Sequence, residues 1–259
     1  MSSDTWTPRA VASERTPWQA DLSRAVEAQH VASTMALVDG LDEQQVLEQV
    51  LDDSKPPVPL AARRLDYLLF PPFRYAPPPG GSRFRGPTDP GVFYAADAIR
   101  TACAELGYWR WRHLLEAPAL AAMPAASQTV FRARVAAEAV DLRQSPFVAD
   151  RLRWTDPVDY AACQRFARTA RGAAVGAIRY ESVRDPQRAG CCAVLDPGAF
   201  ARRAPLEQQT WTLSVMRERV VWQRTHVVGG QSFEFPAATW SATPRPASPR
   251  SPGRRGRRP

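Results

Sequence analysis

Lysine is almost absent from this sequence, and histidine and cysteine are scarce. Lys55 is the only lysine among 259 residues, and there are three histidines and four cysteines. The cysteines show neither metal-ligand spacing nor the pattern of a secreted disulfide framework, so we expect buried thiols and no metal site. The motifs of a serine–histidine–aspartate hydrolase, a P-loop and a zinc site are also missing, which argues against histidine-dependent catalysis.

Long apolar runs are missing as well. No run approaches the roughly 18–20 residues that a membrane-spanning helix needs. The first residues, MSSDTWTPRAVASERT, lack the positively charged and then apolar order of a signal peptide. We therefore expect a cytoplasmic protein with no membrane partner.

Positive charge is plentiful but concentrated at one end. The last sixteen residues, PRPASPRSPGRRGRRP, contain six arginines and no acid, and so account for most of the net charge of +8. This composition predicts a disordered tail over residues 237–259, and the polar, aperiodic residues 1–17 predict a second disordered end. Nucleic-acid binding is thus a hypothesis for the tail alone. Residues 18–236 are long enough for one domain with a substantial core.

Hydrophobic periodicity and turn residues predict an α+β fold. Early helices are followed by short strands, two further helices and a strand-rich end. A regular βαβ alternation with a glycine-rich first turn is absent, which argues against a dinucleotide-binding doubly wound sheet. The expected helices cover residues 18–37, 42–51, 97–115 and 156–171, and the expected strands cover residues 91–95, 129–140, 174–180, 191–195, 210–216 and 219–223.

One carboxylate stands on an otherwise small and apolar helix face. In the helix expected after residue 96, Ala98, Ala102, Glu105 and Trp109 share a face. A buried carboxylate is costly unless it meets a cation or opens into a cleft. Glu105 is therefore either a structural partner of an arginine or the carboxylate of a binding cleft.

Three arginines and a tyrosine precede this glutamate. Arg83 and Arg85 lie in a loop bounded by glycine and proline, Arg74 follows two prolines, and Tyr94 closes a short apolar strand. Guanidinium groups suit phosphate oxygens, and a tyrosine ring can stack on a planar heterocycle. The combination predicts a site for a phosphate-bearing, ring-containing ligand, although each arginine alone is also compatible with a solvated surface charge.

A second polar cluster follows the strand AVGAIRY. Ser182 and Arg184 alternate to the same side of an extended segment. They are candidates to donate hydrogen bonds to a ligand phosphate, or else they decorate the end of a strand.

These segments resemble the RES-domain family, which is named for its arginine, glutamate and serine positions. FRYAP, GSRFR, GVFYAA followed by TACAE, YAACQ and AIRYESVRD occur in the family's order, and the resemblance extends over roughly residues 25–235. Many members are toxins of bacterial toxin–antitoxin pairs, and the characterised ones consume NAD+. The resemblance implies a fold similar to ADP-ribosyltransferase toxins, with NAD+ bound in a cleft.

The resemblance also implies roles for individual residues. Glu105, Arg74 and Tyr94 match catalytic positions. Aligned on the Cys-Gln of YAACQ, the family serine position holds Ala161, and Ser182 is the nearest alternative hydroxyl. The residues expected to hold NAD+ are Arg74, Arg83, Arg85, Tyr94 and Ser182.

The implied reaction treats NAD+ as a substrate and not as a cofactor. Cleavage of the nicotinamide–ribose bond builds positive charge on the ribose, which a carboxylate such as Glu105 can stabilise. Water or inorganic phosphate is the candidate acceptor. Transfer of ADP-ribose to a protein, a nucleic-acid-binding protein that uses the tail, and an inactive relative remain the alternatives. The resemblance further implies a cognate antitoxin and a homo-oligomeric toxin–antitoxin assembly as partners.

Overall fold

The computed structural model describes residues 6–28, 38–225 and 230–241 and forms a single α+β domain, as predicted. No helix within these ranges is both long and apolar enough to cross a membrane. All four cysteines are buried free thiols, which confirms the expectation for them. The elements are α1 (Pro8–Ser13), β1 (Thr16–Glu27), α3 (Leu41–Asp53), η1 (Leu60–Ala62), α4 (Pro71–Arg74), β2 (Phe93–Ala96), α5 (Ile99–Leu115), β3 (Ala122–Asp141), η2 (Phe147–Asp150), α6 (Arg151–Trp154), α7 (Ala161–Gly172), β4 (Ala177–Glu181), β5 (Gly190–Val194), η3 (Pro197–Ala199), β6 (Glu207–Met216), β7 (Arg219–Arg224), β8 (Ser232–Pro236) and α8 (Ala238–Ser241).

The strands of the described chain form one sheet in the order β1-β2-β5-β4-β3-β6-β7-β8. The long strand β3 organises it, because its residues 128–139 pair with β1 while residues 122–132 pair with β6. Since β1 pairs with both β2 and β3, the strands β1, β2, β5, β4 and β3 close into a ring. The β1–β2 closure consists of a single pair, Ser23 with Ala96.

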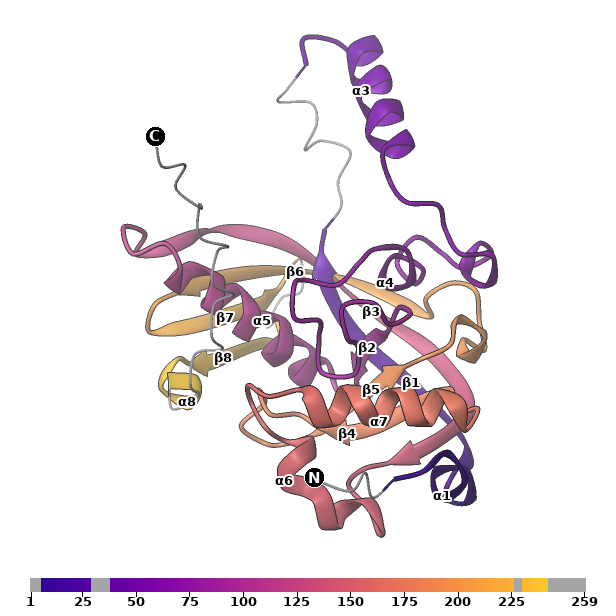
Figure 1. Cartoon of the computed structure of the whole chain (residues 1–259). Coiled ribbons are helices and arrows are strands. Elements are labelled where there is room, and N and C mark those ends of the chain that lie inside the picture. The colour runs from indigo at the N-terminus through magenta and orange to yellow at the C-terminus, as the bar shows by residue number, and fades with distance from the viewer. Residues whose placement is uncertain (1–5, 29–37, 226–229, 242–259) are drawn as a thin grey trace, which may run out of the picture.

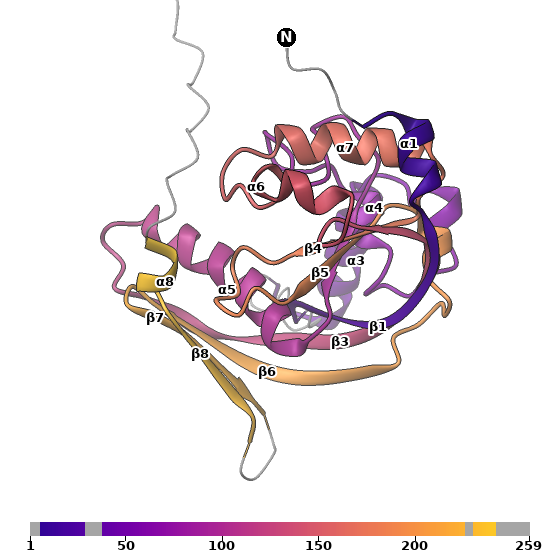
Figure 2. The same cartoon turned by 90° about the horizontal axis from the view of Figure 1, so that it is seen from below.

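Helices cover this sheet in two places. Figure 2 shows α1, α6 and α7 together on one side of the ring and α5 against the sheet formed by β3, β6 and β7. The core under α7 includes Phe166 and Ile178, and the core under α5 includes Tyr108, Trp211 and Trp222. The helix α3 stands away from the rest of the domain (Figure 1).

The helix predicted over residues 18–37 is wrong where the structure describes it. Residues 16–27 form β1, which pairs with β3 from Thr16–Ala139 to Glu27–Gln128, and residues 29–37 lie outside the described residues. The apolar side chains of Trp18, Leu22 and Val26 recur every four residues. That spacing places side chains on one face of a helix and equally on one face of a strand, so periodicity alone could not separate the two.

The predicted disorder at both ends also needs correction. Residues 8–13 form α1, in which Val11 is buried, and residues 238–241 form α8, in which Trp240 is buried. A few apolar side chains that pack on the core suffice to order these short segments. The remaining residues of the two predicted disordered ends, 1–5 and 242–259, lie outside the described residues.

The other predicted elements are confirmed with shifted ends. Helices α3 and α5 and strands β2 to β7 occur where periodicity places them. The helix expected from residue 156 begins instead at Ala161. The Asp156 carboxylate accepts hydrogen bonds from the backbone N–H groups of Val158 and Asp159 and so forms a turn before the helix.

Candidate active site

A cavity of about 430 Å³ opens between β1, β2, α5 and the loop of residues 78–83. It lies beside the single β1–β2 pair, where the sheet ring is weakest. Tyr160, Tyr180, Arg184 and Cys191 complete its wall. The cavity therefore brings together four separate regions of the chain, residues 23–25, 78–109, 160 and 180–191.

The face of α5 predicted from the sequence is the face that lines this cavity. Ala102, Glu105, Leu106 and Trp109 all contribute to the wall. Trp109 is 47% exposed at the rim, whereas Ala102 is buried. Among the residues that line the cavity in the described chain, Glu105 is the only carboxylate. Of the two alternatives for Glu105, the structure thus has the carboxylate in the wall of a cavity.

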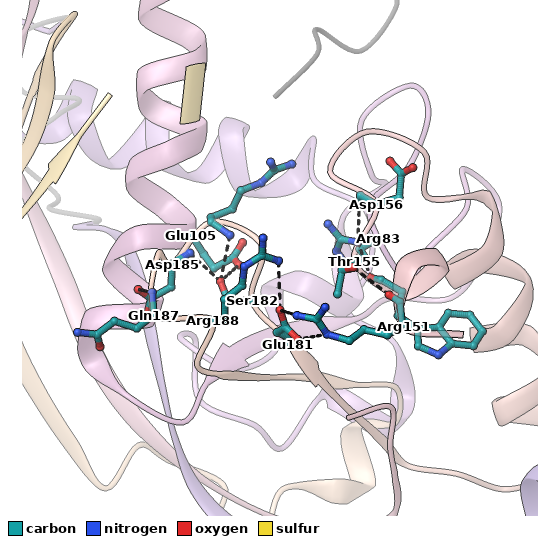
Figure 3. Close-up of polar contacts among 12 residues, drawn as sticks. Arg83, Glu105, Arg151, Thr155, Asp156, Glu181, Ser182, Asp185, Gln187 and Arg188 are labelled. Atoms are coloured by element: carbon teal, nitrogen blue, oxygen red, sulfur yellow. Dashed lines mark hydrogen bonds and ion pairs between the residues drawn. The ribbon is translucent and has the colours of Figure 1, made fainter. Parts of the chain in front are cut away.

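Hydrogen bonds hold the Glu105 carboxylate in place (Figure 3). The Ser182 hydroxyl donates to Oε1 of Glu105 over 2.6 Å and accepts the backbone N–H groups of Arg184 at 3.2 Å and Asp185 at 3.0 Å. With both N–H groups pointing at its oxygen, the hydroxyl proton is directed to the carboxylate. The Cys191 thiol lies 4.0 Å from the same Oε1, and burial raises its pKa well above the usual value, so the thiol stays neutral beside the acid.

Ser182→Ala is expected to lower the free energy of unfolding by about 1–3 kcal/mol, because Ser182 is fully buried and two backbone N–H groups would lose their acceptor. Urea denaturation at pH 7 measures the loss. Ser241→Ala is the control, since that exposed hydroxyl donates to the carbonyl of Ala237, just before α8, and accepts no backbone N–H among the described residues. Equal losses in the two variants would contradict the role given to Ser182.

Two arginines share Tyr160 on one side of the cavity. Arg83 is 8% exposed and donates to the backbone oxygens of Trp154 at 2.8 Å and Asp156 at 2.9 Å (Figure 3). Its guanidinium also lies over the Tyr160 ring at 4.7 Å. Arg184 is 2% exposed and donates to the Tyr160 hydroxyl at 3.1 Å. Arg83 therefore lines the cavity, as the sequence predicts, while its Nη1 holds the loop before α7.

Arg184 keeps one donor unused. Its guanidinium lies over the Tyr108 ring at 3.8 Å and donates through Nη2 to the Pro157 oxygen. The buried Nη1 has no hydrogen-bond partner among the described residues. Because Arg184 lines the cavity, this nitrogen is a candidate donor to an anionic ligand.

A third cavity arginine, Arg24, was missed at the sequence level. It lies on β1, donates through Nη1 to the Tyr94 carbonyl oxygen at 2.5 Å and lies over the Phe93 ring at 4.7 Å. Its buried Nε has no partner among the described residues, and burial lowers the pKa of its guanidinium to about 10. The signal was hidden because residues 18–37 were predicted to be a helix, which would not place Arg24 beside Tyr94.

Tyr94 lines the cavity, but its hydroxyl is engaged. The oxygen accepts the Phe84 backbone N–H at 2.8 Å and lies 2.8 Å from the Ser82 hydroxyl. Tyr94 thus ties β2 to the loop that carries Arg83. Ring stacking on a ligand stays a prediction.

The stability of the fold should depend on pH through Tyr94. Burial raises the pKa of its phenol to about 12, above the usual value of 10. The raised pKa stabilises the folded protein below pH 10, and this contribution is lost as the pH rises from 10 to 12. The difference in unfolding free energy between wild type and Tyr94→Phe should therefore shrink by about 1 kcal/mol from pH 9 to pH 11, measured by urea denaturation. A constant difference would contradict the assignment.

The structure does not bring Arg74 and Arg85 to the cavity. Arg74 ends the short helix α4, donates to the Pro56 oxygen and lies over the Tyr75 ring at 5.7 Å. Arg85 donates to the backbone oxygens of Asp89 at 3.1 Å and Tyr75 at 2.9 Å. Neither side chain lines the cavity. Both arginines shape the loops next to the site, so their assignment as ligand-binding residues is not supported by their placement.

Ala161, the position matched to the family serine, is the exposed first residue of α7 and is not part of the cavity wall. The hydroxyl beside the carboxylate comes from Ser182, 21 positions later in the sequence. An alanine at position 161 therefore removes no donor from Glu105.

Comparison with known proteins decides the family. The RES-domain family model matches residues 58–216, which is more than half of the chain. The chain belongs to the RES-domain family. No curated protein matches the chain. Among solved structures, a chain of the M. tuberculosis MbcT–MbcA toxin–antitoxin complex is similar at 13% identity and a TM-score of 0.45, covering 91% of this chain and 95% of that chain.

The RES-domain match does not include the whole site. Arg83, Tyr94, Glu105, Ser182 and Arg184 fall inside it. Arg24 on β1 precedes it, and β7, β8 and α8 follow it. Within the described residues, no group of three histidine, cysteine, aspartate or glutamate side chains is arranged to hold a metal ion.

Proposed function

We propose that this RES-domain protein cleaves the nicotinamide–ribose bond of NAD+, with water or inorganic phosphate as the acceptor. The observation that carries the proposal is one hydrogen-bonded carboxylate, Glu105, facing a cavity whose wall contains Arg24, Arg83 and Arg184. A volume of about 430 Å³ lies within the range typical of small-molecule sites.

The charge of the cavity favours a diphosphate. Three guanidinium groups and one carboxylate contribute to the cavity wall, so the wall carries an excess of positive charge. Arg24 Nε and Arg184 Nη1 are buried N–H groups without partners among the described residues. Buried donors are normally satisfied, and phosphate oxygens accept strongly from arginine. These two nitrogens are therefore assigned to the diphosphate of NAD+.

The carboxylate suits the chemistry at the ribose. When the glycosidic bond breaks, its electron pair goes to the nicotinamide nitrogen, which is cationic in NAD+ and leaves neutral. Positive charge then develops at C1′ and O4′ of the ribose, and the Glu105 carboxylate stabilises it. Water adds to C1′ and loses a proton, giving ADP-ribose, nicotinamide and H+. With phosphate as the acceptor the product is ADP-ribose 1″-phosphate. The leaving group needs no general acid, in keeping with a cavity wall to which the described part of the chain contributes no histidine.

Nicotinamide release from NAD+ tests the proposal directly. The purified protein is incubated with NAD+ with and without inorganic phosphate, and the products are separated by chromatography. Nicotinamide with ADP-ribose indicates hydrolysis, and nicotinamide with the 1″-phosphate indicates phosphorolysis. Nicotinamide release that depends on an added protein, with label transferred to it, would replace both acceptors with a protein target. No nicotinamide release under any condition would overturn the proposal.

We further propose a cognate antitoxin that covers the cavity. Many RES-domain proteins are toxins, and the rim of this cavity offers the exposed Trp109 and the half-buried Leu106 as an apolar contact. Expression of the protein alone should then arrest bacterial growth, and co-expression of the product of an adjacent small gene should restore it. If that product still relieves the growth arrest caused by the Trp109→Ser variant, the rim is excluded as the contact.

A further inference from the structure

The C-terminal helix α8 is anchored in the core next to the active site. Trp240 is 2% exposed and packs against the rings of Tyr108 at 5.7 Å, Trp111 at 5.7 Å and Phe235 at 5.9 Å. Its indole Nε1 donates to the backbone oxygen of Arg184 at 2.7 Å, and this hydrogen bond is buried. A segment with no part in the RES-domain match thus contacts a residue of the cavity wall.

That hydrogen bond is the first in a short series of hydrogen bonds that leads from Trp240 to Glu105. The N–H of Arg184 donates to the Ser182 hydroxyl, and the hydroxyl donates to Glu105. The carbonyl of the same Arg184 is held by Trp240. The Arg184 peptide groups are therefore fixed from both sides, and their position determines where the Ser182 oxygen lies.

Trp240 also supports the Arg184 side chain. The guanidinium of Arg184 stacks on Tyr108 at 3.8 Å, and the Tyr108 ring in turn packs edge-to-face on Trp240 at 5.7 Å, besides its contacts with Trp109 and Trp111. One indole thus supports both the backbone and, through Tyr108, the guanidinium of Arg184.

We propose that Trp240 is a positioning residue for the active site, acting through Arg184 and Ser182 on the Glu105 carboxylate. The effect on turnover rests on the proposed NAD+ cleavage. Without the indole N–H, the buried Arg184 carbonyl lacks its donor, and the segment 182–185 is free to shift. Trp240 does not line the cavity, so its contribution to turnover is indirect.

Trp240→Phe and Trp111→Phe form a matched pair for the test. Trp111 belongs to the same core cluster, is 4% exposed, and donates its Nε1 to the Arg217 carbonyl at 3.0 Å. Arg217 lies between β6 and β7 and does not line the cavity. Each variant keeps an aromatic ring and removes one indole-to-carbonyl hydrogen bond, so we expect similar losses of stability.

The two variants should differ in turnover and in local protection. At a temperature where both are folded, Trp240→Phe should lower kcat for nicotinamide release by about tenfold, and Trp111→Phe by less than about twofold. Hydrogen exchange at the Arg184 and Asp185 amides should accelerate by about tenfold in Trp240→Phe only. Equal exchange at these amides in both variants would overturn the proposal. If the wild type releases no nicotinamide, the proposed function fails, and the exchange comparison still decides whether Trp240 positions the segment.

Discussion

Glu105→Gln is expected to lower kcat for nicotinamide release by about a thousandfold while leaving KM for NAD+ within about threefold. The variant keeps the size of the side chain and an acceptor for the Ser182 hydroxyl, but it removes the negative charge. That charge matters where the ribose becomes cationic, so its loss should appear in turnover and not in ground-state binding. Nicotinamide release measured over a range of NAD+ concentrations separates the two constants.

Glu116→Gln is the matched control for this prediction. Glu116 follows the same helix, is largely exposed and pairs with His113 at its end, away from the cavity. Its replacement should leave both kinetic constants within about twofold, because exposed ion pairs contribute little. A Glu105→Gln variant that retains more than a tenth of wild-type turnover would remove the carboxylate from the mechanism.

Arg24→Gln is expected to raise KM for NAD+ by about 10- to 100-fold, whereas Arg74→Gln should leave it within about twofold. A tenfold rise in KM corresponds to the loss of one hydrogen bond from a charged donor. A hundredfold rise corresponds to a stronger bond, because Arg24 on β1 is shielded from water. Glutamine is two bonds shorter than arginine, so the variant removes the charge and the Nη1 hydrogen bond to the Tyr94 carbonyl, and places a neutral amide where Nε was.

The comparison of Arg24 with Arg74 tests whether the family motif or the position in the structure identifies the arginine that binds NAD+. Arg74 matches the first family arginine but lies on α4 outside the cavity wall, whereas Arg24 lies in that wall. Direct binding of ADP-ribose by calorimetry checks the result without turnover. If Arg74→Gln weakens binding and Arg24→Gln does not, the diphosphate lies elsewhere, and the assignment of the cavity has to be changed.

Much of the fold could be predicted from local sequence patterns. The α5 helix is readable because a long proline-free run follows Asp97, and the later strands are readable because turn residues bound short apolar runs. β1 was unreadable because the four-residue spacing of Trp18, Leu22 and Val26 fits both a helix and a strand. Its identity depends on pairing with β3, more than a hundred residues away.

The site was predictable where one element carries the chemistry. Glu105 stood out because a carboxylate interrupts the face of α5, and Arg83 because its loop adjoins that helix. Arg24 could not be placed, since only the β1–β2 and β1–β3 pairings bring it to Tyr94. Ser182 was selected for a ligand phosphate, but the structure shows its hydroxyl on Glu105, a contact that requires the packing of α5 against the segment after β4.

The pairing of the long strand β3 determines which fragments or gene fusions of this protein can fold. The RES-domain match, residues 58–216, includes β3 and β6 but excludes β1 on one flank and β7 on the other. A gene fusion or fragment that carries only this segment would bring the family's signature residues without the strands that pair with β3 and β6, and unpaired edges invite aggregation. The folding unit is therefore longer than the RES-domain match, and a fragment of this protein that is to fold must include the residues on both sides of the match.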